Sequence, residues 1–177
     1  MSTKIKKSQL KDHIRDIPDF PKEGIIFKDI TTLLKDKDAF KKSVDLMAKK
    51  FRDKEIDLVV GIEARGFIFG AAVAYKLRKG FVTVRKKGKL PYKTKSITYE
   101  LEYGSDVLEI HEDALPRGSR VLIVDDLLAT GGTIKAVTDL VESQEAIIVG
   151  LAFLVELKFL KGKDRLKDLP IYSILKY

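Results

Sequence analysis

Residues 121–133 constrain the fold of this chain more than any other stretch. Val121–Val124 is an unbroken run of aliphatic residues, which is the pattern of a strand buried on both faces in a parallel sheet. Asp125 and Asp126 follow directly. The next loop consists of small residues, namely Ala129, Thr130, Gly131, Gly132 and Thr133. Beyond it, apolar residues at helical spacing predict a helix with one buried face: Ile134, Val137, Leu140 and Val141.

This composition suits the binding of a phosphorylated sugar. Glycines let the backbone approach a ligand, and the N–H groups at a helix start attract anions. Thr130 and Thr133 add hydroxyl donors, while Asp125 and Asp126 can accept from vicinal hydroxyls or meet a Mg²⁺ ion that a substrate carries. The alternative is a buried strand, an acidic turn and a glycine-capped helix without a ligand. Paired aspartates before Ala-Thr-Gly-Gly-Thr favour phosphate binding, although neither the Walker nor the dinucleotide fingerprint is present.

The stretch resembles the phosphoribosyl pyrophosphate signature of the type I phosphoribosyltransferases, in the variant of the enzymes that use adenine. The resemblance implies that Asp125 and Asp126 hold the ribose hydroxyls and that residues 129–133 hold the 5′-phosphate. It implies purine salvage, in which phosphoribose passes from phosphoribosyl pyrophosphate to adenine and gives AMP and pyrophosphate. It also implies a homodimer, and a Mg²⁺ cofactor that the substrate carries rather than one that protein side chains bind directly.

Composition and charge limit the remaining classes of function. The chain has 177 residues, no cysteine and a net charge of +8, which fits either nucleic-acid binding or a solvated surface with a site for polyanionic substrates. The lysines are spread from end to end, which favours the second interpretation, so no nucleic-acid partner is expected. Met1–Lys11 lacks the apolar core of a signal peptide, and Ala146–Val155 is too short to cross a membrane. We therefore expect a cytoplasmic enzyme without a membrane partner.

Alternating strand and helix patterns predict the fold class. Strands are expected at 57–62, 81–84, 121–125, 146–154 and 171–174. Between them the apolar spacing predicts helices at 38–52 and 67–79, and a weaker amphipathic helix at 3–14. These elements predict an α/β fold, a doubly wound, mostly parallel sheet flanked by helices. With no linker or repeat in between, residues 1–177 are expected to form a single domain.

Residues 92–110 predict a long β excursion. Apolar and polar residues alternate over 92–104, and 107–110 reads as a second strand; we expect both to lie largely outside the main sheet and core, as in a functional lid. In the resemblance, a flexible β hood spans 88–110. Leu101–Gly104 matches the family's Leu-Glu-Tyr-Gly motif, in which Glu102 is the catalytic acid or base. By alternation alone, Glu102 is an exposed strand residue.

Two cationic segments are candidates for binding pyrophosphate. The turn after strand 57–62 contains Ala64 and Arg65, and by itself it is either an anion-binding turn or an ordinary connection with a surface arginine. The resemblance implies pyrophosphate binding there and a cis peptide near Glu63–Ala64. After strand 81–84 comes a run of cations that is a solvated turn or a site for the leaving group, and the resemblance assigns that role to Arg85 and Lys89.

The segment Gly24–Thr31 reads as an edge strand or a packed loop. In the resemblance it recognises adenine through the backbone near Ile26 and the ring of Phe27, with Lys28 where the family often has arginine. Leu157 also contacts the base in that comparison. Residues 16–32 and 88–110 would then provide base recognition and the hood. Two other functions stay open: a phosphoribosyltransferase for a 6-oxopurine, and a non-enzymatic, nucleic-acid-binding regulator that senses phosphoribosyl pyrophosphate.

Overall fold

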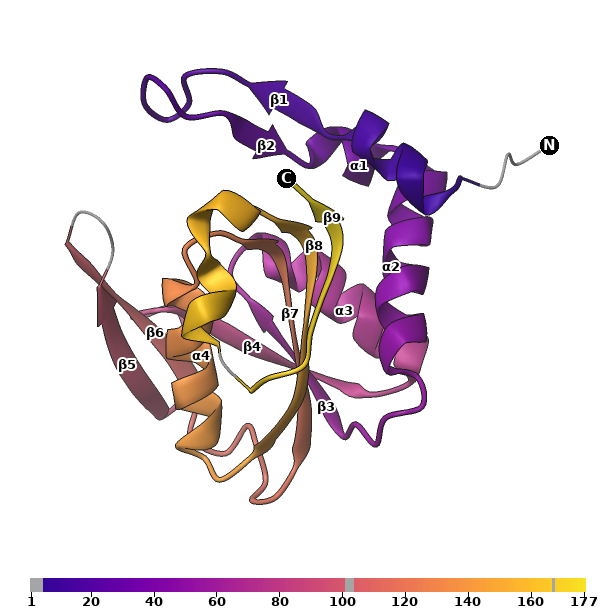
Figure 1. Ribbon diagram of the computed structural model, residues 1–177. Coiled ribbons are helices and arrows are strands. Elements are labelled where there is room, and N and C mark those ends of the chain that lie inside the picture. The colour runs from indigo at the N-terminus through magenta and orange to yellow at the C-terminus, as the bar shows by residue number, and fades with distance from the viewer. Residues whose placement is uncertain (1–4, 101–103, 167) are drawn as a thin grey trace.

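The computed structural model describes residues 5–100, 104–166 and 168–177, and its centre is a seven-stranded sheet in the order β5-β6-β4-β3-β7-β8-β9 (Figure 1). Five strands pair in parallel: β3 (Leu58–Ile62), β4 (Gly80–Lys86), β7 (Arg120–Leu128), β8 (Ile147–Glu156) and β9 (Ile171–Lys176). The predicted mostly parallel α/β sheet is confirmed. In such a sheet the carboxyl ends of neighbouring strands meet at one edge, where ligands bind.

Helices cover both faces of the sheet because its strands are apolar on both sides. The helices α2 (Lys37–Phe51) and α3 (Arg65–Leu77) pack on one face, against a core that contains Val59, Leu122 and Val124. The helix α4 (Gly132–Glu142) packs on the other face, against Val60, Val121 and Ile123. Alternate residues of each strand therefore enter opposite cores. These helices agree with the periodicity at 38–52, 67–79 and 134–141.

The predicted excursion is an antiparallel hairpin of β5 (Thr94–Glu100) and β6 (Ser105–His111). The prediction that it lies largely outside the main sheet and core is wrong. The strand β6 pairs with the end of β4, where Lys86 lies opposite Leu108, and the side chains of Leu108 and Ile110 are buried. Alternation within the segment predicts two strands, but it does not show that one of them extends an existing sheet.

The N-terminal segment forms a lobe at the carboxyl edge of the sheet (Figure 1), and its Leu10, Ile30 and Leu33 belong to the core under α2 and α3. The helix predicted at 3–14 is a 3₁₀ helix, η1 (Lys7–His13), in which only Leu10 is buried. The strands β1 (Arg15–Ile17) and β2 (Phe27–Asp29) form an antiparallel pair that is not part of the main sheet, and α1 (Thr31–Lys35) follows. Gly24–Thr31 is thus an edge strand with its flanking loop.

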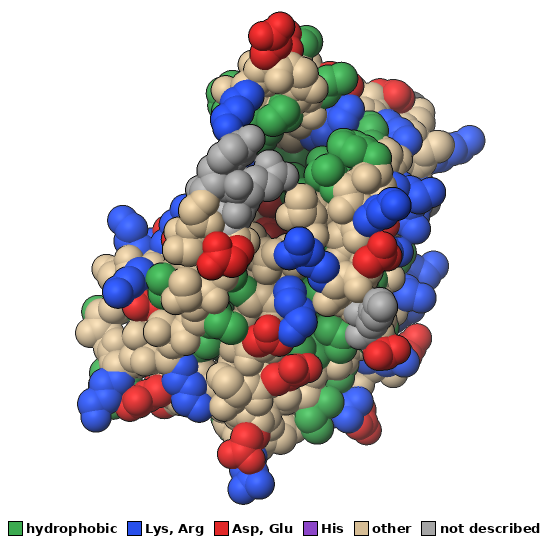
Figure 2. Space-filling view, turned by 60° about the vertical axis from the view of Figure 1, so that its left-hand side comes forward, with side chains coloured by type: hydrophobic (Ala, Val, Ile, Leu, Met, Phe, Trp, Pro, Cys, Tyr) green, Lys and Arg blue, Asp and Glu red, His purple; other side chains and the backbone are tan. Residues whose placement is uncertain are grey.

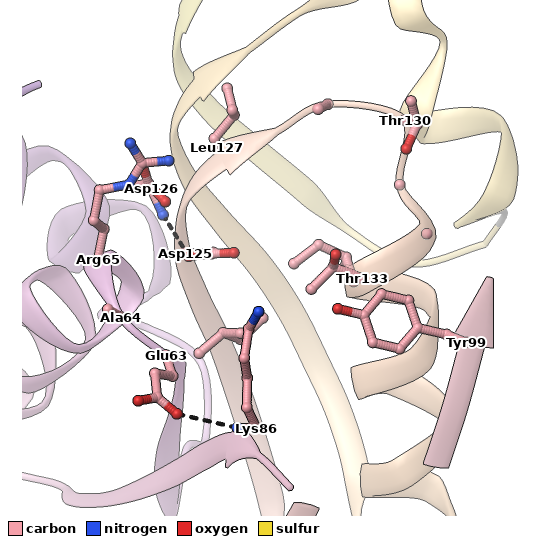
Figure 3. Close-up of a pocket in the computed structure, with 15 residues that line it drawn as sticks. Glu63, Ala64, Arg65, Lys86, Tyr99, Asp125, Asp126, Leu127, Thr130 and Thr133 are labelled. Carbon is pink, nitrogen blue, oxygen red and sulfur yellow. Dashed lines mark hydrogen bonds and ion pairs between the residues drawn. The ribbon is translucent and has the colours of Figure 1, made fainter. Parts of the chain in front are cut away.

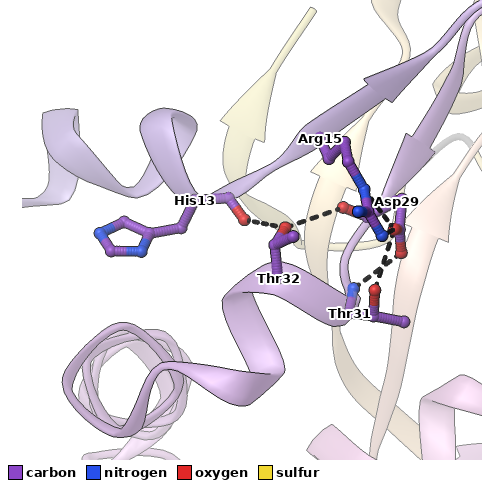
Figure 4. Close-up of polar contacts among 5 residues, drawn as sticks. All are labelled: His13, Arg15, Asp29, Thr31 and Thr32. Carbon is purple, nitrogen blue, oxygen red and sulfur yellow. Dashed lines mark hydrogen bonds and ion pairs between the residues drawn. The ribbon is translucent and has the colours of Figure 1, made fainter.

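Asp29 fixes the base of the β1–β2 hairpin (Figure 4). Its carboxylate accepts hydrogen bonds from the Arg15 guanidinium at 2.6 and 3.0 Å, and from the backbone N–H and hydroxyl of Thr31, both at 2.9 Å. The Thr31 backbone N–H, followed by Arg15, lowers the pKa of Asp29 to about 2. The hydroxyl of Thr32 donates to the carbonyl oxygen of His13 at 2.6 Å. The hairpin is therefore tied to the segments on both sides of it.

Two short 3₁₀ helices, η2 (Lys158–Leu160) and η3 (Gly162–Arg165), connect β8 to β9. Over the described part of the chain, no helix combines the length and apolar character that a membrane span requires.

Replacing Asp29 by asparagine should lower the free energy of unfolding at pH 7 by about 1–3 kcal/mol, because an amide cannot accept all of these hydrogen bonds. A depressed pKa stabilises the fold fully above the unfolded-state value of 3.8, and this contribution is lost as the pH falls toward about 2. Urea unfolding should therefore show a smaller gap between the two proteins at about pH 3 than at about pH 7. Asp53→Asn, at an exposed position, is the matched control. A gap that does not change with pH would contradict the role of the ionised carboxylate.

Candidate active site

A pocket of about 350 Å³ opens at the carboxyl ends of β3 and β7 (Figure 3). Its walls come from the loop after β3, from the end of β7 with the loop that follows, and from the side chains of Lys86 and Tyr99. It brings together Ala64, Arg65, Asp125, Asp126 and residues 129–133, all of which are sequence-predicted site residues. Segments that lie about 60 residues apart in the chain therefore form one site.

Asp125 and Asp126 form the acidic floor of the pocket, with side chains that expose little surface. The Arg65 Nε atom lies 2.8 Å from a carboxylate oxygen of Asp126, and the N–H of Asp126 donates to Asp125 at 2.9 Å. Burial raises the pKa of Asp125, and the charge of Asp126 adds to this effect; burial also raises the pKa of Asp126, against the opposing charge of Arg65. Buried carboxyl groups need donors, and the hydroxyls of a ribose are of the right kind.

The small-residue loop after β7 is held in shape by a second loop behind it. Gly131 has a φ of 83°, in the left-handed region that favours glycine, and α4 begins at the next residue. Gly162 in η3 packs against this loop so closely that a Cβ atom on Gly162 would collide with the carbonyl oxygen of Ala129. The loop thus presents N–H groups at a helix start. Sequence reasoning did not assign Gly162, because a contact between loops of different connections leaves no local pattern.

Arg65 joins the pocket to the N-terminal lobe. It is the first residue of α3 and follows a cis peptide bond between Glu63 and Ala64, at the position that the resemblance implied. Besides its ion pair with Asp126, its guanidinium carbon lies 5.3 Å from the centre of the Phe27 ring. A residue of the predicted base-recognition segment therefore contacts a residue of the predicted phosphoribosyl pyrophosphate site.

Arg85 and Lys89 do not line the pocket. The Arg85 guanidinium forms an ion pair with Glu63 at 2.8 Å and donates to the carbonyl oxygen of Lys89 at 3.0 Å, while the Lys89 side chain is exposed. Lys86 lines the pocket instead, and its ammonium group lies 3.0 Å from Asp106. Strand alternation was the signal that could have found Lys86, because it shares a face with Val84, which is buried in the core under α4.

None of the residues predicted to recognise the base lines the pocket. Ile26 is 56% exposed, and hydrophobic side chains are visible on the upper lobe in Figure 2. Phe27 packs edge-to-face against Phe20, with the two ring centres 5.2 Å apart. The Lys28 ammonium group forms an ion pair with Asp16 at 2.7 Å. Leu157 lies beside the end of β7, because its N–H donates to the carbonyl oxygen of Leu128 at 2.9 Å.

The hood contributes Tyr99, another residue that sequence reasoning did not assign to the site. Its ring lies beside Thr133, across the pocket from Ala64 and Arg65 (Figure 3). The alternation that placed Tyr99 and Ile97 on one side is confirmed, since both pack against the core under α4. The hood continues toward the loop, because the carbonyl oxygen of Glu100 lies 3.6 Å from where a Cβ atom of Gly132 would be. Glu102 lies outside the described residues.

The described residues contain no group of three or more His, Cys, Asp or Glu side chains that could hold a metal ion. The pocket nevertheless has two carboxylates side by side, and oxygen donors of this kind suit Mg²⁺. Its other polar groups are Arg65, Lys86, two threonine hydroxyls and the N–H groups of the loop. This set of groups can bind a ligand that carries phosphate groups at both ends and hydroxyls in the middle.

The chain shares this fold and these motifs with known proteins. The family model of the phosphoribosyl transferase domain matches residues 29–174. The adenine phosphoribosyltransferase of Acidobacterium capsulatum is 60% identical over 168 residues, which are 95% of this chain and 93% of that protein. The adenine phosphoribosyltransferase of Clostridium acetobutylicum is 59% identical over 168 residues, or 95% of this chain and 98% of that protein.

Solved structures of adenine phosphoribosyltransferases have the same fold as this chain. The crystal structure of adenine phosphoribosyltransferase from Thermoanaerobacter pseudethanolicus has a TM-score of 0.94 and 55% identity, covering 97% of this chain and 100% of that one. The enzyme from Saccharomyces cerevisiae, complexed with D-2,5-dideoxy-2,5-imino-altritol 1,6-bisphosphate and adenine, has a TM-score of 0.90 and 43% identity, covering 96% and 98%. The fold and site thus define a phosphoribosyltransferase. Within that class, the chain belongs to the adenine phosphoribosyltransferase family.

Gly162→Ala tests whether η3 supports the loop 129–133 and whether that loop binds phosphoribosyl pyrophosphate. The added methyl group must displace the backbone of Ala129, so the KM for phosphoribosyl pyrophosphate should rise by roughly tenfold or more, as expected when a positioning contact moves by about 1 Å. Steady-state kinetics with phosphoribosyl pyrophosphate varied measure this KM. Gly118→Ala is the control: Gly118 has a positive φ, which Gly162 does not have, so this backbone is strained more by alanine, but a Cβ atom there meets nothing within 4 Å. An equal effect of both substitutions on this KM would show that the contact is not specific.

Proposed function

We propose that this protein transfers the phosphoribosyl group of phosphoribosyl pyrophosphate to adenine, producing AMP and pyrophosphate in purine salvage. The observation that carries the proposal is one pocket in which Asp125 and Asp126 stand beside the loop 129–133 at the start of α4. The relatives that are 59–60% identical over 95% of the chain bear the name of this activity. Neither the 6-oxopurine enzyme nor the regulator has comparable support.

The two ends of the pocket suit the two charged ends of phosphoribosyl pyrophosphate. The N–H groups of residues 129–133 and the hydroxyls of Thr130 and Thr133 would bind the 5′-phosphate. Asp125 and Asp126 would accept hydrogen bonds from the ribose hydroxyls, because buried carboxylates gain most from donors. Ala64 and Arg65 would then face the pyrophosphate, across the acidic floor from the loop.

In the reaction, N9 of adenine attacks C1 of the ribose while the bond from C1 to the pyrophosphate oxygen breaks. Positive charge develops on the ribose ring and negative charge on the leaving pyrophosphate. The protein's task is to hold both reactants in line and to stabilise the departing charge. Arg65 and Lys86 lie in the pocket for that purpose, and Arg85 and Lys89 remain candidates at the adjoining loop. Mg²⁺ carried by the substrate would supply further positive charge to the pyrophosphate.

The base would bind between the N-terminal lobe and the end of β8. The backbone near Ile26, the ring of Phe27 and the side chain of Leu157 would surround adenine, with Lys28 holding the segment from behind. Phe27 already contacts Arg65 of the pocket, which supports placing the base next to the ribose. Glu102 would exchange a proton with the imidazole ring of adenine as the catalytic acid or base.

Three broader properties belong to the same proposal. Residues 1–177 act as one domain, with 16–32 and 88–110 as the recognition and hood elements, and the protein works in the cytoplasm.

The third property is that the protein forms a homodimer. The apolar side chains of Ile68 and Tyr75 on α3, which are 40% and 88% exposed, suit a second copy of the chain. Sedimentation equilibrium measures the assembly, and a monomer at micromolar concentration would refute the dimer.

A product assay tests the activity directly. The protein is mixed with Mg²⁺, phosphoribosyl pyrophosphate and one purine base at a time, and nucleotide and pyrophosphate are measured. AMP from adenine alone is expected. IMP, GMP or XMP as the main product would assign the base site to a 6-oxopurine. Tight binding of phosphoribosyl pyrophosphate without any product, together with salt-sensitive binding of nucleic acid, would support the regulator.

Replacing Asp125 and Asp126 together by asparagine should raise the KM for phosphoribosyl pyrophosphate far more than the KM for adenine. The amides keep the volume but remove the negative acceptors, each of which contributes roughly 1.5–3 kcal/mol when it bonds a donor. Steady-state kinetics with each substrate varied in turn measure the two constants. Equal effects on both would refute the assignment to the ribose hydroxyls.

Glu102→Gln should reduce kcat by about two orders of magnitude or more, with a milder effect on either KM, because a positioned acid or base contributes to the transition state rather than to binding. Glu100→Gln is the control, because Glu100 lies two residues earlier and on the same side of the alternating sequence. A kcat that Glu102→Gln leaves unchanged would remove Glu102 from the chemistry.

A further inference from the structure

We infer that Tyr177 is a positioning residue for the base: it holds the β1–β2 hairpin at a set distance from Leu157, so that both walls of the base site keep their separation. Ile26 and Phe27 lie on the hairpin side, and Leu157 lies on the side of the main sheet. The inference rests on the proposed function, because it assigns Tyr177 a role in binding adenine.

The backbone of Tyr177 is fixed on both sides of Leu157. Its N–H donates to the carbonyl oxygen of Glu156 at 3.0 Å, and its carbonyl oxygen accepts from the N–H of Lys158 at 2.8 Å. These two hydrogen bonds continue the pairing of β9 with β8, where Lys176 lies opposite Glu156. Tyr177 therefore cannot shift relative to Leu157 without breaking the end of the parallel sheet.

The ring of Tyr177 meets the hairpin. The Lys28 ammonium group lies 4.2 Å from the ring centre, and the Lys11 ammonium group from η1 lies 4.7 Å from it. Both distances are within the range of attractive cation–π contacts. Lys28 is held from its other side by Asp16 at 2.7 and 2.8 Å, and its side chain is only 12% exposed. Because Lys28 belongs to β2 and is confined in this way, its contact with the ring fixes β2 relative to Tyr177.

The hairpin needs such a contact, because few backbone hydrogen bonds locate it. The strands β1 and β2 pair only with each other, over three residue pairs, and Asp16 lies opposite Lys28 in that register. Asp29 ties the hairpin base to α1, and Phe27 reaches Arg65. In Figure 1 the C-terminal end lies next to β2, and the Lys28 ammonium group of β2 lies close to the Tyr177 ring. Tyr177 is thus the link between the hairpin and the loop that carries Leu157.

The aromatic face of Tyr177 carries this role. Burial, followed by the nearby charges of Asp16 and Asp12, raises the pKa of the Tyr177 hydroxyl, so the phenol stays neutral. Phenylalanine offers an equivalent ring face to a cation, whereas leucine offers an apolar side chain without the ring quadrupole. Comparing these two replacements separates the ring from simple filling of space.

Tyr177→Leu should raise the KM for adenine by roughly three- to tenfold, the factor that corresponds to a cation–π contact, with kcat and the KM for phosphoribosyl pyrophosphate within about twofold of the wild type. Tyr177→Phe should restore the adenine KM to within about twofold. If Tyr177→Leu does not fold, Lys28→Met tests the same contact and should show the same split between the two KM values. In the double variant the two effects should be less than additive, because both remove one interaction.

Tyr172→Leu is the matched control. Tyr172 lies in β9, which Tyr177 directly follows; its ring also faces a lysine of the N-terminal segment, with Lys7 at 5.4 Å, and it packs against Phe51. Unlike Tyr177, it is not hydrogen-bonded to the residues on both sides of Leu157. Its replacement should lower thermal stability without changing the ratio of the two KM values.

A Tyr177→Leu protein whose two KM values rise equally, or whose adenine KM does not change, would overturn the inference, and so would a control that shifts the adenine KM as strongly. Hydrogen exchange keeps this test independent of the proposed activity. Backbone amides of residues 15–29 should exchange faster in Tyr177→Leu than in wild type, even if the protein made no AMP. Unchanged exchange there would also refute the positioning role, whereas absence of AMP with the wild-type protein would refute the proposed function alone.

Discussion

The placement of two carboxyl groups at the buried end of β7 is the constraint on which the rest of the site depends. Removing a charge from water is costly unless donors or an opposite charge replace the water. Here Arg65 supplies the opposite charge to Asp126, and a backbone N–H satisfies Asp125. The same arginine packs on Phe27. The acidic floor thereby couples the start of α3 to the N-terminal lobe, and the remaining acceptor capacity faces the pocket.

Close backbone approaches shape the remainder of the pocket. A Cβ atom on Gly66 would lie 2.6 Å from the Asp125 carboxylate, so only glycine lets α3 begin so near to β7. In the same way, only glycine at position 162 lets η3 pack so closely against the loop 129–133. The lobe that carries Ile26 and Phe27 is located differently, by an ion-pair network at its base and by side-chain contacts such as Lys28 with Tyr177. The loop 129–133 is thus held by backbone packing, and the N-terminal lobe mainly by side chains.

Much of this arrangement was predictable from local patterns. Runs of aliphatic residues predict the parallel strands, and helical spacing predicts α2, α3 and α4, because burial imposes a period on each. The paired aspartates and the glycine loop were predictable as parts of one site, since they are consecutive in the chain. The hood was harder: its two strands were predicted, but the pairing of β6 with β4 was not. Lys86 enters the pocket from the end of β4, on the face that alternation gives it, whereas Tyr99 enters it through the packing of the hood on the core under α4.

By itself, the sequence determined the class of fold, the strand–loop–helix unit that we propose to bind phosphate, and the family, because each depends on residues that are close together in the chain. Only the tertiary structure decided which of the neighbouring cations enters the pocket, that Gly162 packs against the loop 129–133, and that the Tyr177 ring contacts the Lys28 ammonium group. These contacts join segments far apart in the chain, up to the 149 positions between Lys28 and Tyr177 (177 minus 28). No local period records such contacts, because they arise from how the elements pack rather than from how each one forms.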